Sequence, residues 1–285
     1  NDAAAIKKAD IGIAMGRDVN DVAKEAASMI VLDSNFASIV AAVEEGRTVY
    51  SNIRRFTTYV LASNMPELAP FIMFVMFKFP LALTIMQILA IDLGTDLVPA
   101  LGLGTEMPEP GIMERPPRGP KEHLVNGWVL IRAYIWQGGL EIALSLVAFF
   151  WAYLQRGWTP GAEMASSGPV YMYATTMTLA GIVACQVGNV FCNRTHRQSV
   201  FKVGFFKNKL VLIGVLVEIC LMVTLVYVPF LEGIFGLTPL SLSDWGFLAT
   251  FPVIMLVLDE IRKLIMRSHD KRRPAQTKSI TQIAA

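Results

Sequence analysis

Charge and cysteine are both scarce in this sequence. Only 17% of the 285 residues are charged, while 54% are hydrophobic, and the mean hydropathy is +0.48. Soluble domains carry about 25% charged residues, and here the apolar residues come in blocks rather than on scattered faces. The composition therefore argues against a soluble globular protein and favours a chain with several membrane-spanning segments.

The few cysteines give no sign of a disulfide framework or a zinc site. Cys185, Cys192 and Cys220 lie in apolar segments without CxxC spacing, so we predict buried free thiols. The sequence also lacks a signal peptide, a repeat of fixed period and inverted symmetry between its halves, which argues against many secondary-transporter folds. It begins with Asn1, in what looks like the middle of a motif. We expect a fragment or a processed piece of a longer protein.

Residues 1–50 have the character of a soluble domain. Helical composition at 2–9 and 18–27 alternates with strand-like runs at 11–15 and 29–32, which is typical of a parallel α/β sheet. Two strands are too few to bury a core, so we expect the rest of that domain upstream.

A long amphipathic pattern starts at Phe36, with Asn35 or Ser34 available as its N-cap. No stop signal separates it from the apolar run that starts near Tyr59. We therefore predict one long helix that runs from solvent into the bilayer and is able to carry force between the two parts.

Six apolar blocks follow, each close to the about 20 residues that cross the hydrocarbon core. We predict membrane helices at 57–77, 81–103, 127–153, 171–192, 210–231 and 245–266. Residues 78–80 alone join the first two blocks, which should form a tight hairpin. Basic residues gather at 104–125, at 193–209 and in a tail at 267–285 that we expect to be disordered. The opposite connections hold only Lys78 and Arg156, so the positive-inside rule places both termini in the cytoplasm.

Acids stand inside two of these apolar blocks, in Ser63–Glu67 (SNMPE) and Ile91–Asp96 (IDLGTD). An acid at membrane depth costs about 2.5–3.5 kcal/mol and almost always faces a protein interior. Asn64 and Glu67 are three residues apart and share a helical face. Pro66 removes a backbone donor and frees the carbonyl four residues earlier, which makes it a potential oxygen ligand.

The second block offers a similar set of oxygens. Asp92, Thr95 and Asp96 follow an i, i+3, i+4 pattern and should share one face, while Gly94 and Pro99 weaken the helix around them. Carboxylates, an amide, a hydroxyl and loose carbonyls on two adjacent helices predict an all-oxygen site for a hard cation such as Na⁺, K⁺ or Ca²⁺. The alternative is that these acids are protonated or salt-bridged packing residues. Further polar residues in apolar spans are Gln137, Glu141, Gln186, Asn189 and Glu218.

At these motifs the sequence resembles the cation-transporting P-type ATPases over nearly its whole length. Asn1-Asp2 and the following AAAIKKADIGIAMG resemble the family's GDGxND hinge motif, of which only the last two residues are present. Residues 21–27 and 39–47 resemble the end of the phosphorylation domain and the stalk. SNMPE and IDLGTD resemble the fifth and sixth membrane helices of the calcium and sodium/potassium pumps, and residues 112–118 (IMERPPR) resemble the loop after them.

The resemblance implies roles for particular residues. Asn1 and Asp2 match positions near the aspartyl-phosphate and Mg²⁺. The family's cation-ligand positions fall on Asn64, Glu67, Asp92, Thr95 and Asp96. Glu218 matches a glutamate linked to an extra sodium site. Ser63, Asn189 and Glu218 are additional candidate ligands; Asn189 stands where the calcium pumps have Glu and the sodium/potassium pumps have Asp. Ser63 stands where the gastric proton pump has Lys, which argues against a pump of that kind, and Asp92 favours the sodium/potassium side.

The sequence also departs from the family. It has no DKTGT or TGES motif, no nucleotide-binding domain and no PEGL segment of the fourth membrane helix. The complete pump would use ATP and Mg²⁺, form an aspartyl-phosphate and couple it through the stalk to ion access. This chain alone should neither hydrolyse ATP nor transport a monovalent or divalent cation.

Together these arguments predict a mainly α fold, a six-helix transmembrane bundle preceded by the C-terminal fragment of an α/β, haloacid-dehalogenase-like phosphorylation domain. Residues 1–50 would hold that fragment and the start of the stalk, 51–266 the membrane domain and 267–285 a basic cytoplasmic tail. The expected partners are the bilayer, the missing N-terminal part of the pump and the transported cation, with no nucleic acid; the plasma membrane is the expected location. The competing hypotheses are a passive channel or secondary transporter and a non-catalytic membrane module.

Overall fold

The computed structural model of the chain describes residues 2–17, 19–119 and 122–272, with only the backbone described at 269–272. The described residues fall into two compact units, one formed by those within 1–51 and 107–119 and the other by those within 52–106 and 120–285. Asn1 and the part of the predicted tail from residue 273 onward lie outside the described residues.

The first unit contains the predicted alternation of helices and strands. Its elements are α1 (Ala3–Lys8), β1 (Ile13–Met15), α2 (Asp21–Ala26) and β2 (Met29–Val31). The two strands pair in parallel, with Ile13 opposite Met29 and Met15 opposite Val31. Asn20 caps α2 by accepting a hydrogen bond from the Val22 N–H. The parallel α/β pattern of this segment is confirmed.

Helix α3 (Phe36–Ser63) begins at the predicted cap. The Asn35 side-chain oxygen accepts a hydrogen bond from the Ala37 N–H at 3.0 Å. Two residues before Asn35, Asp33 accepts hydrogen bonds from the Ser38 hydroxyl and the Asn35 N–H. These hydrogen bonds lower the pKa of the Asp33 carboxyl. The helix has 28 residues and belongs to the first unit up to residue 51 and to the second from residue 52. The predicted long helix is therefore present.

The loop Met107–Gly119 belongs to the first unit, whereas the sequence predicted a membrane domain that spans 51–266. Arg47 on α3 donates hydrogen bonds to the carbonyls of Ile112 and Arg115, each at 2.8 Å. Arg115 in turn forms a salt bridge with Glu109 at 2.6 Å. A pattern of hydrophobic residues does not reveal such contacts, because they run through backbone carbonyls.

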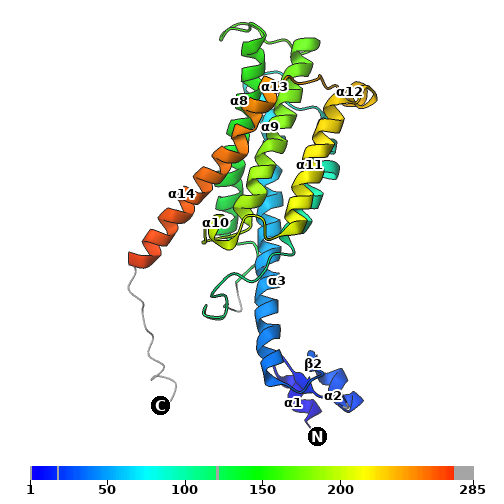
Figure 1. The fold of residues 1–285 in the computed structure, drawn as a ribbon, viewed down its shortest axis with the longest axis vertical. Coiled ribbons are helices and arrows are strands. Elements are labelled where there is room, and N and C mark those ends of the chain that lie inside the picture. The colour runs from blue at the N-terminus through cyan, green and yellow to red at the C-terminus, as the bar shows by residue number, and fades with distance from the viewer. Residues whose placement is uncertain (1, 18, 120–121, 273–285) are drawn as a thin grey trace. The chain divides into compact units, whose positions relative to one another are not determined.

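The second unit contains the membrane helices (Figure 1). Its elements after α3 are α4 (Met65–Phe77), α5 (Ile85–Ala90), the π-helix η1 (Ile91–Thr95), α6 (Leu97–Leu103), α7 (Gly127–Leu130), the π-helix η2 (Ile131–Gln137), α8 (Gly138–Gln155), α9 (Pro169–Asn193), α10 (Val200–Val203), α11 (Lys209–Tyr227), α12 (Pro229–Phe235), α13 (Leu242–Leu248) and α14 (Thr250–Arg272). Within the described residues, six helical stretches are long and apolar enough to cross a membrane, as predicted. The chain is an integral, multi-pass membrane protein.

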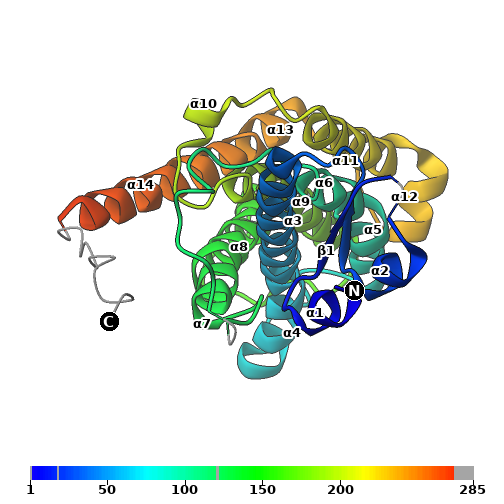
Figure 2. The same cartoon turned by 90° about the horizontal axis from the view of Figure 1, so that it is seen from below.

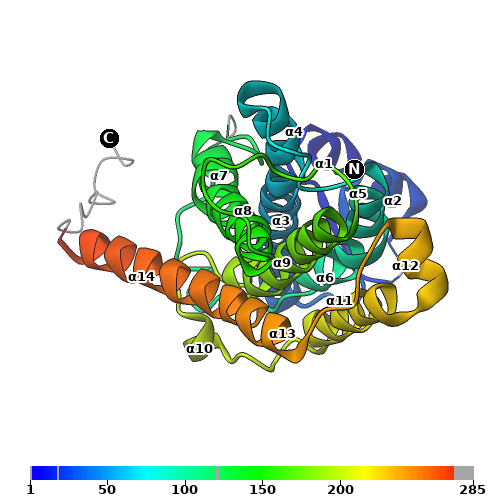
Figure 3. The same ribbon diagram turned by 90° about the horizontal axis from the view of Figure 1, so that it is seen from above.

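Helix α9 is the centre of this bundle. In its most apolar stretch 89% of the residues are buried, against 33% in α11 and 28% in the last span. Figures 2 and 3 show α9 between α8 and α11, with α14 along its side. Glycines permit this close packing: a Cβ on Gly188 would lie 2.8 Å from the Pro252 Cα, and one on Gly181 would lie 3.1 Å from the Ala148 Cβ.

Several boundaries differ from the predicted ones. Helix α14 continues to Arg272, so residues 267–272 of the predicted disordered tail are helical. Helix α11 ends at Tyr227 because Pro229 cannot continue it and instead opens α12. The connection between α4 and α5 runs from residue 78 to 84, longer than the predicted 78–80. Cys185 and Cys192 are buried free thiols, but Cys220 is exposed on α11.

Candidate cation-binding site

The SNMPE stretch lies where two helices meet. Helix α3 ends at Ser63 and α4 starts at Met65, with Asn64 between them. Pro66 has no N–H to continue the hydrogen-bond ladder, which accounts for the break. Glu67, in the first turn of α4, is only 8% exposed, and one of its oxygens is buried without a hydrogen-bond partner among the described residues. Asn64 is exposed, so these two side chains do not share one buried face.

The IDLGTD stretch forms the π-helix η1 rather than a weakened α-helix. Its hydrogen bond runs five residues back, from the Asp96 N–H to the Ile91 carbonyl at 3.1 Å. The expectation that Asp92, Thr95 and Asp96 share a face assumed α-helical spacing. The three side chains differ in exposure: Thr95 and Asp96 are 1% and 6% exposed, whereas Asp92 is exposed but still interacts electrostatically with Asp96. π-Helical turns occur frequently at functional sites.

Neutral oxygens lie beside Asp96, the buried acid directly after η1. The hydroxyls of Tyr59 and Ser63, one turn apart on α3, lie beside the Asp96 carboxylate. Both residues are fully buried, and neither hydroxyl has a hydrogen bond that satisfies strict geometry. The Thr95 hydroxyl donates to the Gln186 side-chain oxygen at 3.2 Å, which links η1 to α9. Tyr59 was not among the predicted site residues, although its place four residues before Ser63 put it on the same helical face.

Four buried carboxylates of this unit have an oxygen without a hydrogen-bond partner and form no salt bridge among the described residues: Glu67 on α4, Asp96 after η1, Glu141 on α8 and Glu218 on α11. Glu141 and Glu218 are fully buried, and none of their four oxygens has a hydrogen-bond partner among the described residues. Glu67 interacts electrostatically with Asp92 and Asp96, and the other buried acids interact with Asp96 as well. The charges that act on each of these four acids are thus mainly those of other carboxylates.

Three polar residues outside the SNMPE and IDLGTD stretches, Glu218, Asn189 and Glu141, have different surroundings. Glu218 lies with the buried acids, as the resemblance implied. Asn189 on α9 is fully buried, but its side-chain oxygen already accepts a hydrogen bond from Asn193 at 2.7 Å. Glu141 was noted as an acid in an apolar span but was not included in the predicted ligand set. Its signal in the sequence was the same as that of Glu218, a single acid among apolar residues.

An unpaired carboxylate inside a bundle is unfavourable unless a cation or a proton neutralises it. The oxygen chemistry of this region suits a hard cation. No group of three or more Asp, Glu, His or Cys side chains within the described ranges is arranged to hold a metal ion. A cation bound here must therefore combine carboxylates with neutral oxygens, such as hydroxyls and the carbonyls freed by the prolines.

Comparisons with known proteins agree with this chemistry. Residues 80–265 match the family model for the C-terminus of cation-transporting ATPases. The chain is 37% identical to potassium-transporting ATPase alpha chain 1 of Xenopus laevis, in an alignment that covers 94% of this chain and 28% of that protein. It is 38% identical to sodium/potassium-transporting ATPase subunit alpha-4 of Rattus norvegicus, over 96% of this chain and 29% of that protein. It is also 38% identical to subunit alpha-3 of Homo sapiens, over 94% of this chain and 29% of that protein. The chain thus spans less than a third of the length of these relatives.

Proposed function

This chain belongs to the cation-transporting ATPase family, and from that premise we propose that it is the membrane portion of an ATP-driven P-type cation pump. Its role is to bind the transported cation between the helices of the second unit. The observation that carries the proposal is the set of four buried carboxylates, Glu67, Asp96, Glu141 and Glu218, that have unpartnered oxygens and form no salt bridge among the described residues. A lipid-facing or purely structural bundle has no use for four such groups, whereas a cation in transit neutralises them.

We propose that the ligands are Asn64, Glu67, Asp92, Thr95 and Asp96, with contributions from Ser63 and Glu218. Glu67, Thr95 and Asp96 supply the buried part of this set. Asn64 and Asp92 are exposed on the same unit, and Asp92 interacts electrostatically with both Glu67 and Asp96. In this arrangement the exposed pair forms the entrance of the site and the buried carboxylates form its inner wall.

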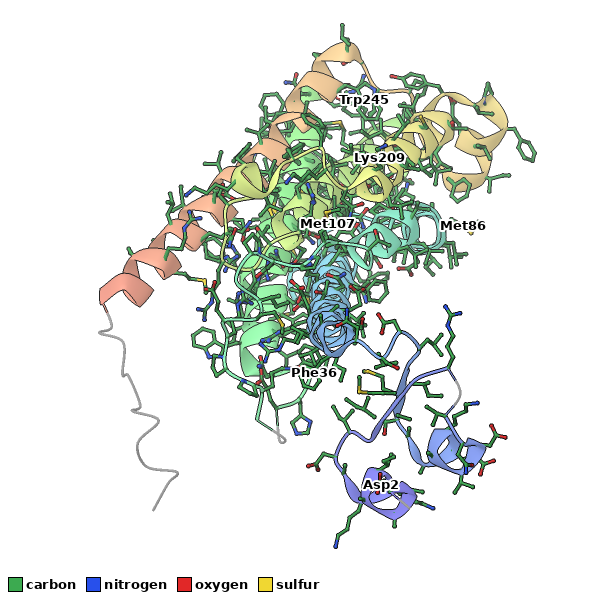
Figure 4. The ribbon with its side chains drawn as sticks, turned by 60° about the horizontal axis from the view of Figure 1, so that its bottom comes forward. Asp2, Phe36, Met86, Met107, Lys209 and Trp245 are labelled. Atoms are coloured by element: carbon green, nitrogen blue, oxygen red, sulfur yellow. The ribbon has the colours of Figure 1, made fainter. Side chains whose placement is uncertain are left out.

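The first unit is proposed to be the C-terminal fragment of a haloacid-dehalogenase-like phosphorylation domain. The parallel β1–β2 pair supports this assignment, as does Asp2 at the start of α1 (Figure 4). Asp2 is exposed and makes no side-chain cap hydrogen bond, so its carboxylate is available to Mg²⁺. Among the described residues, no group of three or more Asp, Glu, His or Cys side chains is arranged to hold Mg²⁺ by itself. In the complete pump, Mg²⁺ and ATP would supply the phosphoryl chemistry.

Helix α3 is the proposed mechanical link. It begins in the first unit and ends at Ser63, directly before the SNMPE break. Tyr59 on this helix packs in a core cluster with residues of α6, α9 and α11. A displacement of α3 would therefore be transmitted directly to the helices that carry the buried acids. The charge distribution of the loops supports cytoplasmic termini, and we propose the plasma membrane as the location.

Na⁺ and K⁺ are the proposed cargo, because the similar proteins are named for transport of sodium and potassium. The test is ATPase activity of the purified full-length protein measured across Na⁺, K⁺ and Ca²⁺. Activity that depends on Na⁺ or K⁺ and passes through an acid-stable phosphoprotein supports the proposal. Cation flux without ATP, or ATP hydrolysis that no cation changes, contradicts it.

A further inference from the structure

The orientation of the Asn189 amide is set by its neighbour one turn later on α9. The Asn193 side-chain nitrogen lies 3.1 Å from the Asn189 backbone carbonyl, which is able only to accept a hydrogen bond. The Asn193 amide must therefore present its NH₂ group on this side. The same nitrogen lies 2.7 Å from the Asn189 side-chain oxygen and 3.3 Å from the Gln137 side-chain oxygen. The Asn189 oxygen is thus occupied by a donor.

This hydrogen bond turns the other end of the Asn189 amide towards α8. The Asn189 side-chain nitrogen is buried and has no hydrogen bond of ideal geometry among the described residues. The group that it interacts with is the Glu141 carboxylate. An NH₂ group repels a cation, whereas it stabilises a carboxylate. In this orientation Asn189 is suited to hold Glu141 and unsuited to bind the transported ion.

Helix packing places Glu141 beside the predicted site. Gly138 lies one turn before Glu141 on the same face of α8. A Cβ on Gly138 would lie 2.6 Å from the Met65 side chain, so this glycine permits close approach of α8 to the start of α4. Glu67 is in that first turn of α4. Glu141 is fully buried, forms no salt bridge among the described residues, and interacts electrostatically with Glu67 and Asp96.

We propose that Glu141 is a direct ligand of the transported cation, and that Asn189 is a positioning residue that acts only through Glu141. The proposal rests on the proposed function as a cation pump and extends the site to α8. Glu141 supplies a hard, negatively charged oxygen, while Asn193 and Gln137 fix the amide that holds it. The ion would then be bound from α8 as well as from the α4 and η1 segments.

The experiment is equilibrium binding of radioactive sodium and of rubidium, as a potassium substitute, to the purified full-length protein without ATP. Four variants are compared with the wild type: Glu141→Gln, Asn189→Leu, the double variant and Glu163→Gln. Glu163 is exposed in the loop between α8 and α9 and serves as the matched control. We expect Glu141→Gln to weaken binding of at least one ion by about tenfold or more, because the number of charged ligands sets affinity. Glu163→Gln should bind as the wild type does.

The double variant tests the role of Asn189. If Asn189 acts only through Glu141, Asn189→Leu weakens binding in the wild type but has no further effect in the Glu141→Gln background. Additive effects of the two substitutions would contradict the positioning role. Should Glu141→Gln fail to fold, Glu141→Asp keeps the charge and withdraws it by one methylene. Weaker binding by Glu141→Asp supports the proposal, and unchanged binding overturns it.

The same measurement on Asp96→Asn separates this inference from the function on which it rests. If Asp96→Asn loses binding while Glu141→Gln binds within about twofold of the wild type, Glu141 is not a ligand although the pump assignment stands. If neither substitution changes binding, the cation site itself is wrongly placed.

Discussion

Arg194 at the end of α9 donates hydrogen bonds to both carboxylate oxygens of Glu106, a residue 88 positions earlier in the chain. The two side chains are 1% and 5% exposed. Arg194 also donates to the Phe205 carbonyl at 2.6 Å, and Asn208, the cap of α11, donates to Glu106 at 3.0 Å. A single carboxylate therefore ties the turn after α6 to the end of α9 and the start of α11.

We predict that loss of either charge in this pair destabilises the second unit. Glu106→Gln should lower the free energy of unfolding by about 3–5 kcal/mol, because it leaves Arg194 buried without a counter-charge. Thermal and denaturant unfolding of the purified protein measure the effect. The control is Asp21→Asn, which removes an exposed salt bridge with Lys24 and should cost at most about 1 kcal/mol. Equal losses in the two variants would contradict the structural role of the buried pair.

Gly214 on α11 allows this helix to lie against α6. A Cβ there would be 2.7 Å from the Pro99 Cα and 2.8 Å from the Pro99 nitrogen. Gly214→Ala should therefore lower the unfolding free energy by about 1–3 kcal/mol through overpacking. Gly233→Ala on α12 is the matched control, because a Cβ at Gly233 meets nothing within 4 Å. The control should be neutral or slightly stabilising, and a Gly214→Ala protein as stable as the control would refute the close packing.

The predicted orientation is tested with single exposed cysteines. Lys202→Cys, on the short helix α10 between α9 and α11, should react with a membrane-impermeant thiol reagent only from the cytoplasmic side. Glu163→Cys, in the loop between α8 and α9, should react only from the other side. Both are made in a Cys220→Ser background, because Cys220 is exposed whereas Cys185 and Cys192 are buried. Reaction of Lys202→Cys from outside intact cells would reverse the assigned topology.

Glu67 offers a quantitative test of the α4 part of the site. Glu67→Gln keeps the shape of the side chain but removes a buried charge that interacts with Asp92 and Asp96. We expect the apparent affinity for the activating cation to fall by about tenfold or more, as measured by the cation dependence of ATPase activity in the full-length protein. Glu163→Gln should leave it unchanged. An affinity within about twofold of the wild type would remove Glu67 from the ligand set.

The fold follows closely from the sequence because its main signals are strong and local. Apolar stretches such as the one in α9 must cross the bilayer as helices, and Asn35 marks the start of α3 with a side-chain cap. The α1–β2 segment was predicted from the alternation of apolar runs with helical composition. Boundaries were less accurate, since the end of α11 depends on Pro229 and the length of α14 on residues beyond its apolar stretch.

The site was predicted less completely than the fold. Its acids were recognised from their cost in an apolar span, but their faces were inferred from α-helical spacing. The segment instead forms the π-helix η1, in which Asp92 is exposed, whereas Asp96 directly after it is buried. The role of Asn189 depends on which end of its amide faces Glu141, and this is set by the contact with Asn193. No pattern within one sequence specifies such an orientation, because it arises from packing between helices.

Cation-stimulated phosphorylation from ATP tests the central claim most directly, namely that the buried acids form the ion site of an ATP-driven pump. Asp96 is the carboxylate with which Glu67, Glu141 and Glu218 all interact. In the full-length protein, Asp96→Asn should abolish the stimulation of phosphoenzyme formation by the transported cation, while Glu163→Gln should retain it. Stimulation by the cation that is unchanged in Asp96→Asn would contradict the account.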